Sequence, residues 1–272
     1  MTNPIIFDRK RYLHHLTRAS AAPEEFLLRE LADRLCERLL DMSREFPDTL
    51  VISPLPAVVA DYIPASAGVK NIIQHAESEE EILPFSENQF DLLIHCGGLH
   101  WVNDLAGMLI QIQRVLKPDG LFLAMIPGGE TLKELRQSFE AAEMIARGGI
   151  SPRVSPFVDI RDAGALLQRA GFALPVVDSQ PLTVAYEHPL KLLRELRAMG
   201  QTNALLESAK HFTPCSLMMQ MVNEYFQKFT REEDGRIAAT FELITMTAWK
   251  PHASQQQPLA RGSGKTHLTD IL

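Results

Sequence analysis

The sequence contains little cysteine, and its three cysteines stand far apart. Cys36, Cys96 and Cys215 are odd in number and form no CxxC pair, which excludes a disulfide framework and indicates a reducing compartment. The histidines likewise show no pair with the spacing of a zinc site. The composition therefore predicts a protein without disulfides and without a metal centre.

The chain also has no long apolar segment and no excess of positive charge. No run approaches the roughly 18 apolar residues that a membrane-spanning helix needs, so no membrane span is predicted. The formal net charge of −7 argues against nucleic acid as the main ligand. The N-terminus shows no apolar signal core, and we therefore expect a cytoplasmic location.

The most informative segment is residues 83–120, which reads as strand–helix–strand together with the residues that follow it. Residues 90–96 form a short apolar run of buried-strand length, and two glycines end it. Apolar residues from 101 to 116 then recur with helical spacing. The sequence Lys-Pro-Asp-Gly at 117–120 stops this helix, with Gly120 expected in the left-handed turn, and another strand follows. A βαβ unit of this kind predicts an α/β fold with a mostly parallel sheet.

The remaining patterns predict further elements on both sides of this unit. Helices are expected from Pro23 and at 130–147, 159–170, 189–199 and 217–229, and strands at 49–53, 70–74, 175–178, 183–186 and 238–249. The last strand is long, rich in β-formers and suited to an antiparallel position. We expect an N-terminal helical region at 1–48, a main domain with helical insertions at 49–250, and a flexible tail at 251–272.

The chain contains a series of short motifs: IFDR at 6–9, LPF at 83–85, LHWV at 99–102, LKPDG at 116–120, GGETL at 128–132, GISP at 149–152, SPF at 155–157, AGF at 170–172, MG at 199–200, DG at 234–235 and AWK at 248–250. In their order and spacing these motifs resemble the class I S-adenosylmethionine (SAM) dependent methyltransferases, and in particular their branch of arginine-hydroxylating complex I assembly factors. The resemblance implies a Rossmann-like, doubly wound sheet. Because the similarity begins at Ile6, we expect no presequence and a bacterial cytoplasmic protein.

The chain departs from this family where the cofactor should bind. The family's acidic residue falls on Val51, and its three loop glycines fall on Ser53, Leu55 and Ala57, while Pro54 and Pro56 each remove a backbone donor.

After the second strand, His75 or Ala76 occupies the position of the acidic residue that binds the ribose in the family. By comparison with the family, about one helix and one strand are missing before Leu83. Glu79 is left as the acidic cofactor contact. We therefore expect SAM to bind weakly or not at all.

Two groups of residues are candidates for a site at the carboxyl edge of the sheet. His100 and Trp101, at the entrance of the predicted helix, are expected with Glu79 on the cofactor side; Trp101 as a core anchor is the alternative. The substrate or partner side is expected at Gly128, Gly129 and Glu130, which follow the next strand, and at Arg153, whose loop borders the protein-substrate cleft in the family that the chain resembles; a turn, a helix cap and an exposed loop are the alternatives. No catalytic residue is assigned.

Two functions are consistent with these observations. The first is a methyltransferase-fold protein that acts in complex I assembly by binding a protein subunit, with its cofactor site eroded. The second is a working SAM-dependent enzyme, either a methyltransferase or an arginine hydroxylase. Titration with SAM separates them.

Overall fold

The computed structural model describes residues 5–209 and 212–256, which form a six-stranded sheet in the order β2-β1-β3-β4-β6-β5. The strands are β1 Asp48–Ile52, β2 Asn71–His75, β3 Phe90–Cys96, β4 Leu116–Pro127, β5 Ala173–Tyr186 and β6 Ile237–Trp249. Neighbours from β2 to β4 are parallel, whereas β6 is antiparallel to both β4 and β5. The predicted mostly parallel sheet with a late antiparallel strand is confirmed.

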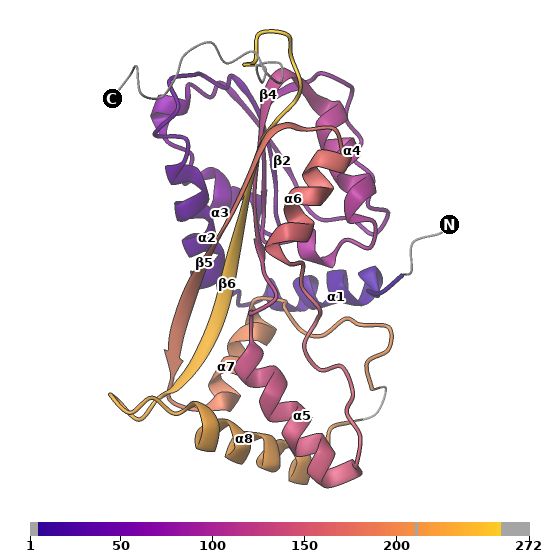
Figure 1. Cartoon of the computed structure of the whole chain (residues 1–272), viewed down its shortest axis with the longest axis vertical. Helices are drawn as coiled ribbons and strands as arrows, with labels where there is room; N and C mark the ends of the chain where they lie inside the picture. Colours follow the sequence, from indigo (N-terminus) through magenta and orange to yellow (C-terminus); the bar gives the residue numbers. More distant parts are fainter. Residues whose placement is uncertain (1–4, 210–211, 257–272) are drawn as a thin grey trace, which may run out of the picture.

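Helices cover both faces of the sheet, as Figure 1 shows. The helices α2 Phe26–Glu37 and α3 Pro56–Ala60 lie on one face, and α4 Leu105–Val115 and α6 Ile160–Arg169 lie on the other. Because successive strand residues point to opposite faces, Val51 packs with the α2 side and Leu50 with the α4 side. The doubly wound arrangement therefore contains two separate hydrophobic cores.

A second group of helices packs beyond the carboxyl ends of the parallel strands. It comprises α5 Lys133–Arg147, α7 Pro189–Ala198 and α8 Cys215–Phe229, in the lower part of Figure 1. The N-terminal helix, α1 Arg9–Ala19, lies between this group and the sheet. The strand order changes direction at β1, which has β2 on one side and β3 on the other, and such switch points are where open α/β sheets bind ligands.

Three local expectations differ from the structure. The helix expected from residue 101 is a 3₁₀ turn at Leu99–Trp101 followed by α4, which begins at Leu105 because the Asp104 carboxylate accepts the Gly107 N–H at 2.9 Å. The left-handed residue in the 117–120 turn is Asp119, with φ of 63°, and not Gly120. The two strands expected at 175–178 and 183–186 are one strand, β5, because β6 pairs along its whole length.

The predicted loss of a helix and a strand leaves β2 at the edge of the sheet. Residues 76–89 contain neither element, and the side chains from Asn71 to Gln74 are exposed. The proposed boundary at residues 48 and 49 stays a prediction, since α2 from the first segment packs on the sheet. Most of the expected tail at 251–272 lies outside the described residues.

We predict that the two neighbours of Leu50 in the sheet differ strongly in their contribution to stability. Leu93 on β3 is fully buried, whereas Ile73 on the edge strand is 37% exposed. Leu93→Ala should lower the free energy of unfolding by about 2–5 kcal/mol, and Ile73→Ala by clearly less, because only the first leaves a closed cavity. Urea denaturation of both variants measures the difference. Equal losses would contradict the edge position of β2.

Candidate functional site

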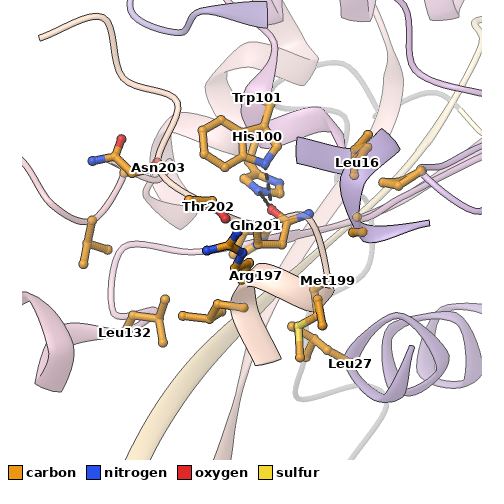
Figure 2. A pocket seen from close by; sticks show the side chains of 18 of the residues that line it. Leu16, Leu27, His100, Trp101, Leu132, Arg197, Met199, Gln201, Thr202 and Asn203 are labelled. Carbon is orange, nitrogen blue, oxygen red and sulfur yellow. Dashed lines mark hydrogen bonds between the residues drawn. The ribbon is translucent and has the colours of Figure 1, made fainter. Parts of the chain in front are cut away.

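A cavity of about 1120 Å³ lies beyond the carboxyl ends of β1, β3 and β4. Its walls come from segments far apart in the sequence: the loops after these strands, α1, α2, the loop at 152–157, and the segment after α7. Figure 2 shows the part around His100 and Trp101, with Leu27, Leu132 and Met199 on other walls. A cavity of this size is large enough for a nucleotide-sized ligand or for an extended side chain.

Gln201 is the centre of the polar contacts in Figure 2, and sequence reasoning did not find it. Its side-chain oxygen accepts the Trp101 indole N–H at 2.7 Å and lies 3.2 Å from Nε2 of His100. The backbone N–H of Gln201 donates to the Leu196 carbonyl, and Gly200 before it adopts a left-handed φ of 74° that ends α7. A rigid helix end therefore fixes this side chain.

Trp101 combines the two roles that the sequence left open. Its side chain is 3% exposed and forms a small core with Phe7 and Tyr12, whose rings lie 5.2 Å and 5.0 Å from the indole. Trp101 also lines the cavity. The indole is therefore a core residue whose remaining surface forms part of the wall.

His100 lines the cavity beside Trp101 and is held neutral by burial. Burial lowers the pKa of His100 to about 3, against a smaller opposing effect of the hydrogen bond to Gln201. Its Nδ1 atom is buried and has no hydrogen-bond partner among the described residues. Its imidazole thus serves as a neutral hydrogen-bonding group at physiological pH.

The acidic residue that reaches the cavity after β2 is Glu77, whereas Glu79 is exposed and does not line it. The Glu77 side chain is 4% exposed and pairs with the buried Arg9 of α1 at 3.0 Å. Arg9 also lies 3.3 Å from Glu81, and His95 lies 3.7 Å from the other oxygen of Glu77. That oxygen, Oε1, is buried without a hydrogen-bond partner. We call Arg9, Glu77, Glu81 and His95 the polar cluster.

Gly128, Gly129 and Glu130 lie at the end of β4, but none of the three lines the cavity. The Gly128 N–H bonds to the carbonyl of Glu242 on β6, and the Glu130 side chain is 65% exposed and pairs with Lys133. The next two residues, Thr131 and Leu132, do line the cavity. The end of β4 therefore lies near the cavity, as expected, but the side chains that line the cavity are those of Thr131 and Leu132 and not those of residues 128–130.

Arg153 lines the cavity and is positioned by a buried carboxylate. It pairs with Glu143 at 2.6 Å, donates to the Thr213 hydroxyl at 2.7 Å and lies over the Phe139 ring at 5.5 Å. Burial alone would raise the pKa of Glu143, but hydrogen bonds from Ser151 and the ion pair with Arg153 lower it. The structure therefore brings together His100, Trp101 and Arg153, and leaves out Glu79 and residues 128–130.

The loop after β1 offers few donors to a cofactor. Pro54 and Leu55 line the cavity, but the prolines at 54 and 56 have no N–H, and the N–H of Leu55 points to the Ser53 hydroxyl at 3.3 Å. The two prolines therefore leave this end of the cavity with fewer backbone donors than a glycine-rich loop would offer. Glu77 fits a donor-bearing group, such as a ribose hydroxyl or a cation.

Neither a metal cluster nor a membrane span is visible in the described part of the chain. Within residues 5–209 and 212–256, no three His, Cys, Asp or Glu side chains come together as metal ligands. No helix in the same ranges is long and apolar enough to cross a membrane.

The strand order, the switch at β1 and the cavity beyond the carboxyl ends define a protein with the class I methyltransferase fold. Consistent with this, the profile of a family described as "Methyltransferase domain" matches residues 54–124.

The chain belongs to the family of the mitochondrial arginine-hydroxylase NDUFAF5, as two relatives that match over most of their length show. It is 35% identical to the Danio rerio protein over 91% of this chain and 82% of the relative. It is 36% identical to the Homo sapiens protein over 98% of this chain and 83% of the relative. Among solved structures, the YcgJ protein of Bacillus subtilis is 14% identical, with a TM-score of 0.48 over 80% of this chain and 98% of that one.

We predict that Trp101→Ala destabilises the domain by about 3–5 kcal/mol, because it removes a buried ring and its two aromatic neighbours lose their contact. Trp101→Phe should cost less, since it keeps the ring and loses mainly the hydrogen bond to Gln201. Chemical denaturation followed by far-UV circular dichroism measures both. A Trp101→Ala variant as stable as wild type would show that the indole is not part of the core.

We also predict that the stability contributed by Glu143 depends on pH. Its pKa is lowered in the folded state, so its contribution is complete above the ordinary glutamate pKa of about 4.3 and is lost as the pH falls through the folded value. The difference in unfolding free energy between wild type and Glu143→Gln should therefore shrink below about pH 4.3. A difference that stayed constant between pH 7 and pH 3 would exclude this assignment.

Proposed function

We propose that this chain acts in respiratory complex I assembly by binding an arginine-bearing segment of a protein subunit in the cavity. The relatives are named arginine-hydroxylase, which supports arginine as the side chain of the guest. The observation that carries the proposal is Glu77, the member of the polar cluster that lines the cavity. The cluster contains the two carboxylates of Glu77 and Glu81 and the single guanidinium of Arg9 between them.

An arginine side chain suits this end of the cavity for three reasons. Its guanidinium has five N–H donors, and Glu77 Oε1 is a buried carboxylate oxygen without a partner. Charge-assisted hydrogen bonds of this kind are about twice as strong as neutral ones. The aromatic and apolar side chains of the walls, including Phe157, Leu27 and Met199, can pack on the methylene groups of the guest.

We further propose that SAM binds weakly. The donor-poor loop after β1 leaves the methionine carboxylate without the backbone N–H groups that it would need. Catalysis by this chain alone would then be weak or absent, and its contribution to assembly would be to hold the partner. The expected cytoplasmic, bacterial location stays a prediction; the curated relatives are named mitochondrial. The absence of nucleic-acid binding also stays a prediction.

One observation favours the second candidate, an active SAM-dependent methyltransferase or arginine hydroxylase. Arg197 is an exposed residue that lines the cavity, and no carboxylate of the described residues lies within ion-pair distance of it. A SAM carboxylate could pair with Arg197 in place of the missing loop donors, while Glu77 accepted the ribose hydroxyls. The cofactor would then supply the activated methyl group or assist oxidation, and these residues would hold it.

The two candidates make opposite predictions for calorimetry. If the cavity is a partner site, SAM should bind wild type with a dissociation constant well above the low micromolar range. Arg197→Ala should leave this dissociation constant unchanged. Low-micromolar binding that Arg197→Ala weakens would establish the SAM-dependent enzyme instead. Far-UV circular dichroism of the variant confirms that the fold is intact.

Capture of the partner tests the proposal directly. A complex I subunit, or its arginine-bearing peptide, should be retained by the immobilised wild-type chain and lost with Glu77→Gln, because the variant removes the charge of Glu77. Arg9 keeps its contact with Glu81 in this variant, and far-UV circular dichroism checks that the fold is intact. Glu130→Ala is the matched control, since the Glu130 side chain lies outside the cavity and should bind like wild type. Retention by Glu77→Gln, or equal losses in both variants, would exclude the cavity as the partner site.

A further inference from the structure

The hydrogen bonds around Gln201 determine which nitrogen of His100 carries the proton. The indole nitrogen of Trp101 is a donor only, so the Gln201 atom that lies 2.7 Å from it must be the carbonyl oxygen and not the amide nitrogen. The same oxygen lies 3.2 Å from His100 Nε2, and an oxygen can only accept there. His100 Nε2 must therefore carry the hydrogen.

A neutral imidazole has one protonated and one unprotonated nitrogen, and burial keeps His100 neutral. With the hydrogen on Nε2, the other nitrogen, Nδ1, presents a lone pair. Nδ1 is buried and accepts no hydrogen bond from the described residues, although its ring lines the cavity. A buried acceptor without a donor is unfavourable, so a group that donates to it gains free energy.

Fixed contacts hold this arrangement in place. Gln201 follows the left-handed Gly200 at the end of α7, and the next residue, Thr202, accepts a contact from His15 Nδ1 of α1 through its carbonyl at 3.1 Å. On the other side, the His100 ring lies between Trp101 at 5.3 Å and Phe157 at 5.8 Å. The imidazole thus has little freedom to turn over and exchange its nitrogens.

We propose that Gln201 holds His100 as the Nε2–H tautomer and that His100 Nδ1 accepts a hydrogen bond from an N–H or O–H donor of the guest in the cavity. This inference rests on the proposed function, because it assumes that a guest enters. The inference adds a specificity. A hydroxyl, amide or guanidinium group can donate to Nδ1, whereas a carboxylate or ether oxygen has only lone pairs and cannot form a hydrogen bond with it. Gln201 is a positioning residue, and His100 is the residue that contacts the guest.

The tautomer is measured in the full chain, without any guest, by ¹⁵N–¹H correlation spectra of the histidine rings at neutral pH. The signal missing from His100→Asn identifies His100. We expect a protonated Nε2 and an unprotonated Nδ1, in wild type and in Gln201→Glu, whose carboxylate still accepts both bonds. A protonated Nδ1 in wild type overturns the inference.

The acceptor role is measured with agmatine, which carries a guanidinium but no carboxylate, and with glutarate as an acceptor-only probe. Agmatine should shift the ¹⁵N resonance of His100 Nδ1 towards the values of a hydrogen-bonded nitrogen, and glutarate should leave this resonance unchanged. Gln201→Met should weaken agmatine binding roughly tenfold, the equivalent of one hydrogen bond. The matched control is Gln168→Met, on the exposed face of α6, which should bind like wild type.

A Nδ1 signal that agmatine leaves unchanged would overturn the acceptor role. If that signal responds to Arg9→Met in the free protein, Nδ1 accepts from Arg9 and not from a guest. This result can occur while a complex I subunit is still captured, so failure of this inference is distinct from failure of the proposed function.

Discussion

The buried ion pair between Arg9 and Glu77 joins the N-terminal helix to the edge of the sheet, and the inner wall of the cavity depends on it. Both side chains are almost fully removed from solvent. Taking charges out of water is expensive, and removing one partner of such a pair leaves the other uncompensated. Once Arg9 is in place, α1 brings Tyr12 onto Trp101 and His15 onto the segment after α7. One electrostatic contact thereby fixes three walls.

Those walls are assembled from parts of the chain that are distant in sequence. Phe7 forms a bridge with Leu205, the Asp8 N–H donates to the Ala204 carbonyl, and Trp101 reaches Gln201 across a hundred residues. Such contacts close long loops, and their entropic cost is recovered only when the rest of the chain has folded. The cavity is therefore a property of the completed fold, and no single segment carries it.

The sheet and most helices could be predicted from the sequence because their signals are local. The apolar run of β3 and the helical spacing of α4 are visible within a dozen residues. The shortened connection after β2 follows from the small number of residues between that strand and Leu83. His100, Trp101 and Arg153 could be placed because they follow strand ends or recognisable motifs. Thr131 and Leu132 were not assigned to the site, because the orientation of a side chain after a strand depends on turn geometry.

Glu77 and Gln201 could not be predicted, for different reasons. Several acids follow β2, and the one that turns inward is selected by Arg9 on a helix far away in sequence. Gln201 is a single amide after a helix, without periodicity or motif of its own, and its role exists only through Trp101 and His100. Pairings over such separations follow from tertiary packing and leave no trace in local composition.

The open edge at β2 has a further consequence for the molecule in a crowded solution. A sheet that ends in a strand with free backbone groups, two exposed isoleucines and no proline or charge among its five residues is a template for another strand. Sheet edges are usually protected by charge, twist or a covering element. Here β2 has no neighbouring strand on its outer side within the described residues, so we expect this edge to be the place where copies of the chain associate in concentrated solution.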